Sequence, residues 1–218
     1  MMSIPDNLKK RLLTVFVGAP IVIGLLYIGG LTFKFFMGVA MFLAFYEWFC
    51  MSKKSKYGIA LALLGSMYII AGFISIYMLR QLDDGFVFVL LLLLSVWGSD
   101  SVAYIIGKTL KGPKMSPTIS PNKTWSGYIG ALLGASIPFI IYNSGDDILL
   151  ILMLSVIVGI VGQSGDLMVS ALKRHVKVKD TGALFPGHGG MLDRIDALLL
   201  VAPVLLFALP VIFEKVGG

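Results

Sequence analysis

The sequence predicts an all-α protein, a polytopic bundle of transmembrane helices with about seven spans and a cytoplasmic N-terminus. The first supporting observation is composition: 57% of the 218 residues are hydrophobic and 14% are charged, whereas a typical soluble domain has about 25% charged residues. The second is that the apolar residues form runs close to the length of about 20 residues that crosses a bilayer. The third is that Lys and Arg are concentrated in alternate connections between these runs.

Seven apolar runs are candidate spans. The first four are long and clear, the fifth is short and rich in glycine, and the sixth runs into polar residues before it ends. We expect spans at residues 12–30, 32–50, 58–79, 86–107, 127–142, 148–172 and 197–213. The first run follows basic residues like a signal peptide but shows no matching cleavage site, so we interpret it as an anchor. We expect residues 1–94 to form N-terminal transmembrane helices and residues 95–218 a catalytic transmembrane region with cytoplasmic loops.

The distribution of positive charge predicts the orientation. With seven spans, all Lys and Arg residues except Lys34, Arg80 and Lys215 fall on the side of the N-terminus. Because cytoplasmic loops carry an excess of these residues, the two long polar loops at residues 108–126 and 173–196 are expected in the cytoplasm. The net charge of +6 comes from Lys and Arg residues that lie between apolar runs and not on an amphipathic surface. We therefore expect no nucleic-acid partner.

Acidic residues within the spans are candidates for chemistry, because a charge in the membrane is costly and is usually functional. Asp100 lies eight residues before Lys108, and Asp166 lies seven residues before Lys173. At the helical rise per residue, both carboxylates are expected roughly 10–12 Å below the inner surface, where they can line one cavity. The alternative for each is pairing with a nearby lysine or a neighbouring helix.

A second acidic pair stands just before the last apolar run. Asp193 and Asp196 are three residues apart, so they share one face of a helix start, and ordinary capping is the alternative. The glycines before them, Gly189 and Gly190, allow a ligand to approach the backbone, and a helix N-terminus offers N–H groups to phosphate. Glu47, near the inner end of the second run, is interpreted as reaching interfacial water.

The loop at residues 116–124 combines hydroxyl groups and Lys123 with two prolines. Its spacing is not that of a Walker A loop, and a plain connector between spans explains it equally well. His188, in the other polar loop, is left without a role.

These segments resemble the motifs of a known family, the phosphatidate cytidylyltransferases (CDP-diacylglycerol synthases). The family's signature is similar to the run Ser170-x-Leu172-Lys173-Arg174, four residues, Lys179-Asp180-x-Gly182, two residues, Phe185-Pro186-x-His188-Gly189-Gly190-Met191-x-Asp193-Arg194-Ile195-Asp196. Its upstream motifs resemble Asp100-x-x-Ala103-Tyr104-x-x-Gly107-Lys108 and Ser120-Pro121-Asn122-Lys123-Thr124. The resemblance therefore covers roughly residues 95–200. Ser126 departs from the pattern, since the family usually shows a glutamate there.

The resemblance implies transfer of a cytidylyl group from CTP to phosphatidic acid, giving CDP-diacylglycerol and pyrophosphate in phospholipid biosynthesis. It also implies a homodimer among the lipids of a bacterial inner membrane, with the active site facing the cytoplasm. Magnesium is the expected cofactor, either as two divalent ions or as one beside a monovalent ion. Because the nucleophile is already a phosphate oxyanion, the reaction needs neutralisation of charge more than it needs a general base.

Site roles are assigned on this basis. We expect metal binding by Asp166, Asp193, Asp196 and, second in order, Asp100. The catalytic set comprises Asp166, Asp193, Asp196 and Lys173. The expected substrate-binding residues are Lys123, Ser120, Thr124, Arg174, Lys179, Arg194, Gly189 and Gly190.

Other functions remain open at this point. One alternative is a CTP-dependent transferase that acts on another lipid phosphate or on a polyprenol. Acceptor tails contact generic apolar residues, so the sequence does not distinguish these acceptors from phosphatidic acid. CDP-alcohol phosphotransferases are disfavoured because their D-G-x-x-A-R motif is missing. A membrane transporter also places acids in spans, but its polar groups are expected to reach the midplane from both sides, whereas here they gather on the inner side.

Overall fold

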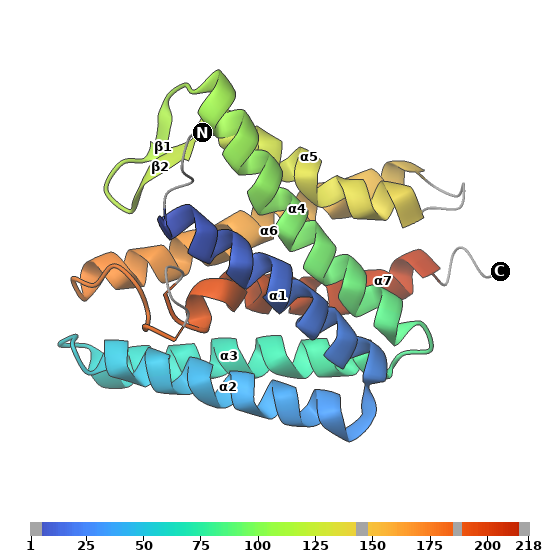
Figure 1. Cartoon of the computed structure of the whole chain (residues 1–218), viewed down its shortest axis with the longest axis horizontal. Coiled ribbons are helices and arrows are strands. Elements are labelled where there is room, and N and C mark those ends of the chain that lie inside the picture. Colours follow the sequence, from blue (N-terminus) through green and yellow to red (C-terminus); the bar gives the residue numbers. More distant parts are fainter. Residues whose placement is uncertain (1–5, 143–147, 185–188, 214–218) are drawn as a thin grey trace. The chain divides into compact units, whose positions relative to one another are not determined.

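The structure is a computed structural model that describes residues 6–142, 148–184 and 189–213 of the chain (Figure 1). The all-α prediction is confirmed, with one short β-hairpin in the loop that the sequence left without secondary structure. The elements are α1 (Asp6–Ile28), α2 (Gly30–Ser52), α3 (Gly58–Gln81), α4 (Gly85–Leu110), β1 (Lys114–Ser116), β2 (Ser120–Thr124), α5 (Trp125–Tyr142), α6 (Ile148–His175) and α7 (Leu192–Phe213).

Several of these helices can cross a membrane, so the chain is an integral membrane protein. Within the described part of the chain, five helices are long and apolar enough by length and composition: Gly30–Ser52, Gly58–Gln81, Gly85–Leu110, Trp125–Tyr142 and Ile151–His175. The first helix adds a shorter apolar segment, Phe16–Ile28. The count of seven spans and the orientation stay predictions.

The chain forms two compact units. Unit 1 comprises residues 1–70 and 175–195, and unit 2 comprises residues 71–174 and 196–218. Helices α3 and α7 therefore contribute to both units. The predicted division into N-terminal helices (residues 1–94) and a catalytic region (residues 95–218) is a division by function, and it stays a prediction.

Unit 1 contains α1, α2 and the first part of α3, which runs antiparallel beside α2 (Figure 1). Gly29 and Gly30 have φ angles of 65° and 53°, which glycine adopts without steric cost and which let the chain turn between α1 and α2. The indole N–H of Trp48 on α2 donates to the carbonyl of Leu61 on α3 at 2.7 Å. A Cβ at Gly65 would overlap the same indole, so glycine is what lets Trp48 lie against α3.

Glycines bring the helices of unit 2 into close contact. Helix α4 crosses α5 (Figure 1), and a Cβ added at Gly98 would lie 2.6 Å from the Gly134 carbonyl oxygen. On α6, a Cβ at Gly165 would lie 2.9 Å from the carbonyl oxygen of Asp196 on α7. Small residues permit such backbone approach between membrane helices. The polar residues next to these glycines, Asp100 and Asp166, are consequently held close to neighbouring helices.

The hairpin connects α4 to α5 within unit 2. Strands β1 and β2 are antiparallel, with Lys114 opposite Thr124 and Ser116 opposite Ser120, and the register is irregular between the two pairs. The backbone N–H of Trp125 donates to the Pro113 carbonyl at 3.1 Å, which closes the hairpin at the start of α5. The polar loop thereby acquires a fixed shape above the two helices that it joins.

We expect Gly134→Ala to lower the free energy of unfolding by about 1–3 kcal/mol, because the new methyl group would overlap the Gly98 carbonyl and overpack the helix crossing. Titration with a denaturing detergent in mixed micelles measures this. Gly38→Ala is the matched control, since an added Cβ there meets nothing within 4 Å and alanine favours the helix. Equal stability of the two variants would contradict glycine-mediated packing of α4 against α5.

Candidate functional site

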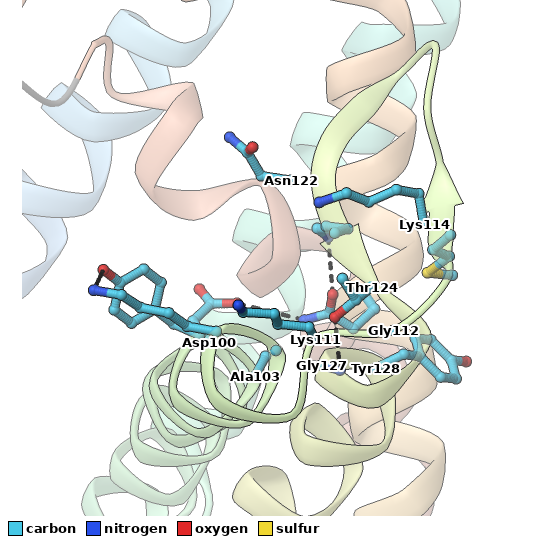
Figure 2. A pocket seen from close by; sticks show the side chains of 15 residues that line it. Asp100, Ala103, Lys111, Gly112, Lys114, Asn122, Thr124, Gly127 and Tyr128 are labelled. Atoms are coloured by element: carbon cyan, nitrogen blue, oxygen red, sulfur yellow. Dashed lines mark hydrogen bonds between the residues drawn. The ribbon is translucent and has the colours of Figure 1, made fainter.

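A cavity of about 630 Å³ lies in unit 2 among the end of α4, the hairpin and the start of α5. Four lysines line it: Lys108, Lys111, Lys114 and Lys123. Figure 2 shows Asp100 and Lys111 from the α4 side of the cavity and Lys114 from the hairpin side. The lining has four basic side chains and one acidic side chain, Asp100, and this excess of positive charge favours a multiply charged anion such as a phosphate chain.

Lys123 joins the hairpin to α6. Its ammonium group lies 2.6 Å from Oδ2 of Asp166 and donates to Oε1 of Gln163 at 2.8 Å. The amide Nε2 of Gln163 in turn lies 3.5 Å from Oδ1 of Asp100 and 3.5 Å from Oγ of Ser99, and both of these residues are on α4. The side chains of Lys123 and Asp166 are only 20% and 30% exposed, so water screens their attraction less than at an open surface.

Three of the predicted metal ligands gather in unit 2. Asp196 is 8% exposed and interacts electrostatically with Asp166, Lys173 and Asp100. The hydroxyl of Ser170 donates to Oδ1 of Asp166 at 3.1 Å, one turn along α6. Lys173 supplies a buried positive charge beside the acids. Asp100 lines the cavity but Asp166 is not among its lining residues, and the shared depth of the two acids in the membrane stays a prediction.

The chemistry of these acids fits magnesium, because carboxylate oxygens are the ligands that this hard cation prefers. In the described ranges, no group of three or more His, Cys, Asp or Glu side chains is arranged as a ready ligand set. Instead, the ammonium group of Lys123 supplies the positive charge beside Asp166. The metal-binding roles of Asp100, Asp166 and Asp196 therefore stay predictions.

Asp193 belongs to unit 1, where it holds the glycine loop, which comprises the described residues 181–184 and 189–190 before α7. Its Oδ2 accepts the backbone N–H groups of Thr181 at 2.8 Å and of Gly190 at 2.9 Å. The Thr181 hydroxyl lies 2.9 Å from the same oxygen. Gly189 has a φ angle of 79°, and a Cβ there would overlap the Asp193 carboxylate. One oxygen of Asp193 is thus used to hold the loop, while its metal-binding role stays a prediction.

The interpretation of Glu47 as a residue that reaches interfacial water is wrong. Glu47 is 5% exposed. Its Oε1 accepts the N–H of Met191 at 2.8 Å, and its Oε2 accepts the N–H of Leu192 at 2.9 Å. Its Oε2 also lies 2.8 Å from the Thr181 hydroxyl. The available signal was a charged residue within an apolar run, which is a functional candidate by default.

These contacts show which groups occupy the α7 N-terminus in the structure. The sequence predicted that its backbone N–H groups face phosphate, but those of Gly190, Met191 and Leu192 donate to the protein's own carboxylates. A phosphate at these three groups would have to displace Asp193 or Glu47. The phosphate-binding roles of Gly189 and Gly190 stay predictions.

Other predicted substrate residues shape the hairpin. Thr124 lines the cavity, yet its hydroxyl accepts the N–H of Gly127 at 3.1 Å and so caps α5. Arg174 Nε donates to the Ile119 carbonyl between the strands at 3.2 Å. Ser126, which departs from the family pattern, donates to the Lys111 carbonyl.

The remaining predicted phosphate binders are less constrained. Ser120 begins β2, opposite Ser116. Lys179 and Arg194 have exposed side chains in unit 1, and their roles stay predictions. His188 lies outside the described residues. The sequence did not single out Gln163, Lys108, Lys111 or Lys114 as site residues, because a polar or basic residue near a span end is also typical of membrane anchoring.

Comparison with known proteins identifies similar chains. A family model described as "Cytidylyltransferase family" matches residues 53–212. The phosphatidate cytidylyltransferase of Staphylococcus haemolyticus is 37% identical over 183 residues, which cover 82% of this chain and 70% of that protein. The one of Rickettsia felis is 35% identical over 214 residues, covering 93% and 92%. The one of Bacillus subtilis is 40% identical over 151 residues, covering 67% and 56%.

The contact between Lys123 and Asp166 predicts energetic coupling. In a double-mutant cycle with Lys123→Met and Asp166→Asn, we expect a coupling energy of about 1 kcal/mol or more, because each single change leaves a partly buried charge without its partner. Free energies of unfolding in mixed micelles give the four corners of the cycle. Additivity within about 0.5 kcal/mol would show that the ion pair contributes nothing.

Proposed function

The chain belongs to the cytidylyltransferase family, as a phosphatidate cytidylyltransferase, and from this premise we propose how its residues carry out the reaction. The enzyme transfers a cytidylyl group from CTP to phosphatidic acid. A phosphate oxygen of phosphatidic acid bonds to the α-phosphorus of CTP, the bond from that phosphorus to the bridging oxygen breaks, and pyrophosphate leaves. The products are CDP-diacylglycerol and pyrophosphate.

The observation that supports our site assignment best is the junction at Lys123. This residue lines the four-lysine cavity and is paired with Asp166, while Gln163 links it to Asp100. A cationic cavity suited to phosphate thus adjoins carboxylates suited to a metal ion. Joining two highly charged phosphates requires both, since their mutual repulsion opposes the reaction.

The lysines bring the anionic substrates together. Lys108, Lys111 and Lys114 bind phosphate oxygens in the cavity, and Lys123 exchanges part of its interaction with Asp166 for a phosphate group. No strong general base is needed, because the attacking phosphate is already ionised near neutral pH. The proposed supporting residues for phosphate are Lys173, Arg174, Lys179, Arg194, Ser120, Thr124, Gly189 and Gly190.

The acids hold the cofactor, which we propose to be magnesium. Asp100, Asp166 and Asp196 are the proposed ligands in unit 2, and Asp193 is the proposed ligand from unit 1. When bound, a divalent ion neutralises charge on the phosphates and stabilises the charge that develops on the leaving group.

The membrane arrangement follows from the charge distribution. We propose seven spans with a cytoplasmic N-terminus, in the inner membrane of a bacterium, because Lys and Arg concentrate on one side and the relatives are bacterial. The cavity then faces the cytoplasm, where CTP is available, while the diacyl tails remain among the helices. We also propose a homodimer.

The comparisons favour this activity over the alternatives left open by the sequence. The relatives carry the name phosphatidate cytidylyltransferase, which favours phosphatidic acid over a polyprenol or another lipid phosphate as acceptor. Asp100 also lines the cavity and Asp166 is paired with Lys123, one of its lysines. This supports a phosphate-binding site over a transporter, whose polar groups are expected to reach the midplane from both sides.

We expect purified protein in lipid nanodiscs to release pyrophosphate from CTP only when phosphatidic acid and magnesium are both present. A coupled pyrophosphate assay measures the rate, and mass spectrometry identifies CDP-diacylglycerol. A panel with a polyprenol phosphate and an ether-lipid phosphate tests the acceptor. If well-folded protein released no pyrophosphate with phosphatidic acid, the assignment would be wrong.

We expect Asp196→Asn to lower kcat by about tenfold to a hundredfold without lowering the free energy of unfolding. The buried carboxylate lies near Asp166 and Asp100, so neutralising it removes repulsion and the cost of burying a charge while impairing metal binding. Asp83→Asn, in the exposed turn between α3 and α4, is the control and should retain kcat. Normal turnover of Asp196→Asn would remove Asp196 from the proposed ligands.

A further inference from the structure

We propose that Glu47 is a positioning residue of the transferase: its carboxylate fixes the glycine loop and the start of α7, and thereby orients Asp193. The inference rests on the proposed function, which assigns Asp193 to the reaction. Glu47 lies on α2, outside residues 53–212 that the family model matches and outside the signature from Ser170 to Asp196. An N-terminal helix thus contributes to the catalytic region.

The Glu47 carboxylate caps α7 from another helix. The first N–H groups of a helix lack partners within the helix, and a negative charge near them is favourable. Leu192 is the first residue of α7, and Glu47 accepts its N–H and that of the preceding Met191 at 2.9 and 2.8 Å. Hydrogen bonds to an ionised acceptor are stronger than those between neutral groups.

Thr181 extends this contact to Asp193. Its hydroxyl lies 2.8 Å from Oε2 of Glu47 and 2.9 Å from Oδ2 of Asp193, and it donates its single hydrogen to one of them at a time. Thr181 is 8% exposed and Glu47 is 5% exposed, so water competes poorly for these positions. Displacement of Glu47 therefore disturbs both the α7 start and the partners of Asp193.

Two glycines of the loop provide a separate line of support. A Cβ added at Gly182 would lie 2.6 Å from Oε1 of Glu47, and a Cβ at Gly190 would overlap both carboxylate oxygens. Neither glycine has a left-handed φ angle, so backbone conformation does not require glycine at either position. Glycine is needed there because the Glu47 carboxylate occupies the space.

An amide cannot replace this carboxylate. Both oxygens of Glu47 face a backbone N–H, so a glutamine in either orientation would turn its own NH₂ group toward one of these donors. Glu47→Gln is nearly isosteric and preserves packing. It therefore tests the positioning role with little change in the volume of the core.

We expect Glu47→Gln to lower kcat for pyrophosphate release by about tenfold or more, with a smaller change in KM for CTP. Hydrogen exchange of peptides that contain residues 189–192 should become faster. Trp48→Phe is the control, because it removes a 2.7 Å hydrogen bond from the same turn of α2, directed to α3. It should lower stability but retain kcat per folded molecule. Unchanged kcat and unchanged exchange in Glu47→Gln would overturn the proposal.

A double-mutant cycle at Gly182 and Glu47 tests the same contact independently of folding yield. Gly182→Ala should slow turnover in the wild-type background but cost about threefold less when combined with Glu47→Ala, because the overlapping oxygen is then absent. Multiplicative effects of the two changes would overturn the proposal. If wild-type protein showed no transferase activity, the proposed function would fail, whereas hydrogen exchange and the stability of these glycine variants would still test the contact itself.

Discussion

A buried carboxylate must be compensated, because removing a charge from water costs several kcal/mol unless a cation or hydrogen-bond donors replace the lost hydration. This constraint organises both units of the protein. In unit 2, Asp166 is compensated by Lys123, and Lys173 provides positive charge for Asp196. In unit 1, Glu47 is compensated by backbone N–H groups at the α7 start. The positions of the hairpin and of the glycine loop depend on these pairings.

The two kinds of compensation suit different tasks. A lysine that neutralises an acid can also bind a phosphate, so the pairing in unit 2 can be exchanged during a reaction that gathers anionic groups. Backbone N–H groups are fixed by the helix to which they belong, so the Glu47 contact is better suited to holding a loop in place. Close helix approach at glycines, such as Gly98 against Gly134, keeps the acids of unit 2 at a common junction.

The sequence predicted part of this arrangement from local geometry. Counting helical residues from Lys108 and Lys173 predicted one depth for Asp100 and Asp166, and contacts through Gln163 and Lys123 link these two acids. The hairpin was not predicted, because its strands have only three and five residues and proline is unfavourable in most strands. The Glu47 contact spans 144 residues to Met191, and helical periodicity carries no information at that range.

Labelling of lysines with an amine-reactive reagent tests most directly whether the basic cavity is the phosphate-binding part of the transferase site. Protein in nanodiscs would be labelled with and without CTP and phosphatidic acid, and mass spectrometry would report modification at each lysine. We expect the substrates to protect Lys108, Lys111, Lys114 and Lys123, whereas Lys54, exposed in the turn after α2, should react equally in both conditions. Undiminished labelling of the four cavity lysines at saturating substrate would contradict a phosphate-binding role for the cavity.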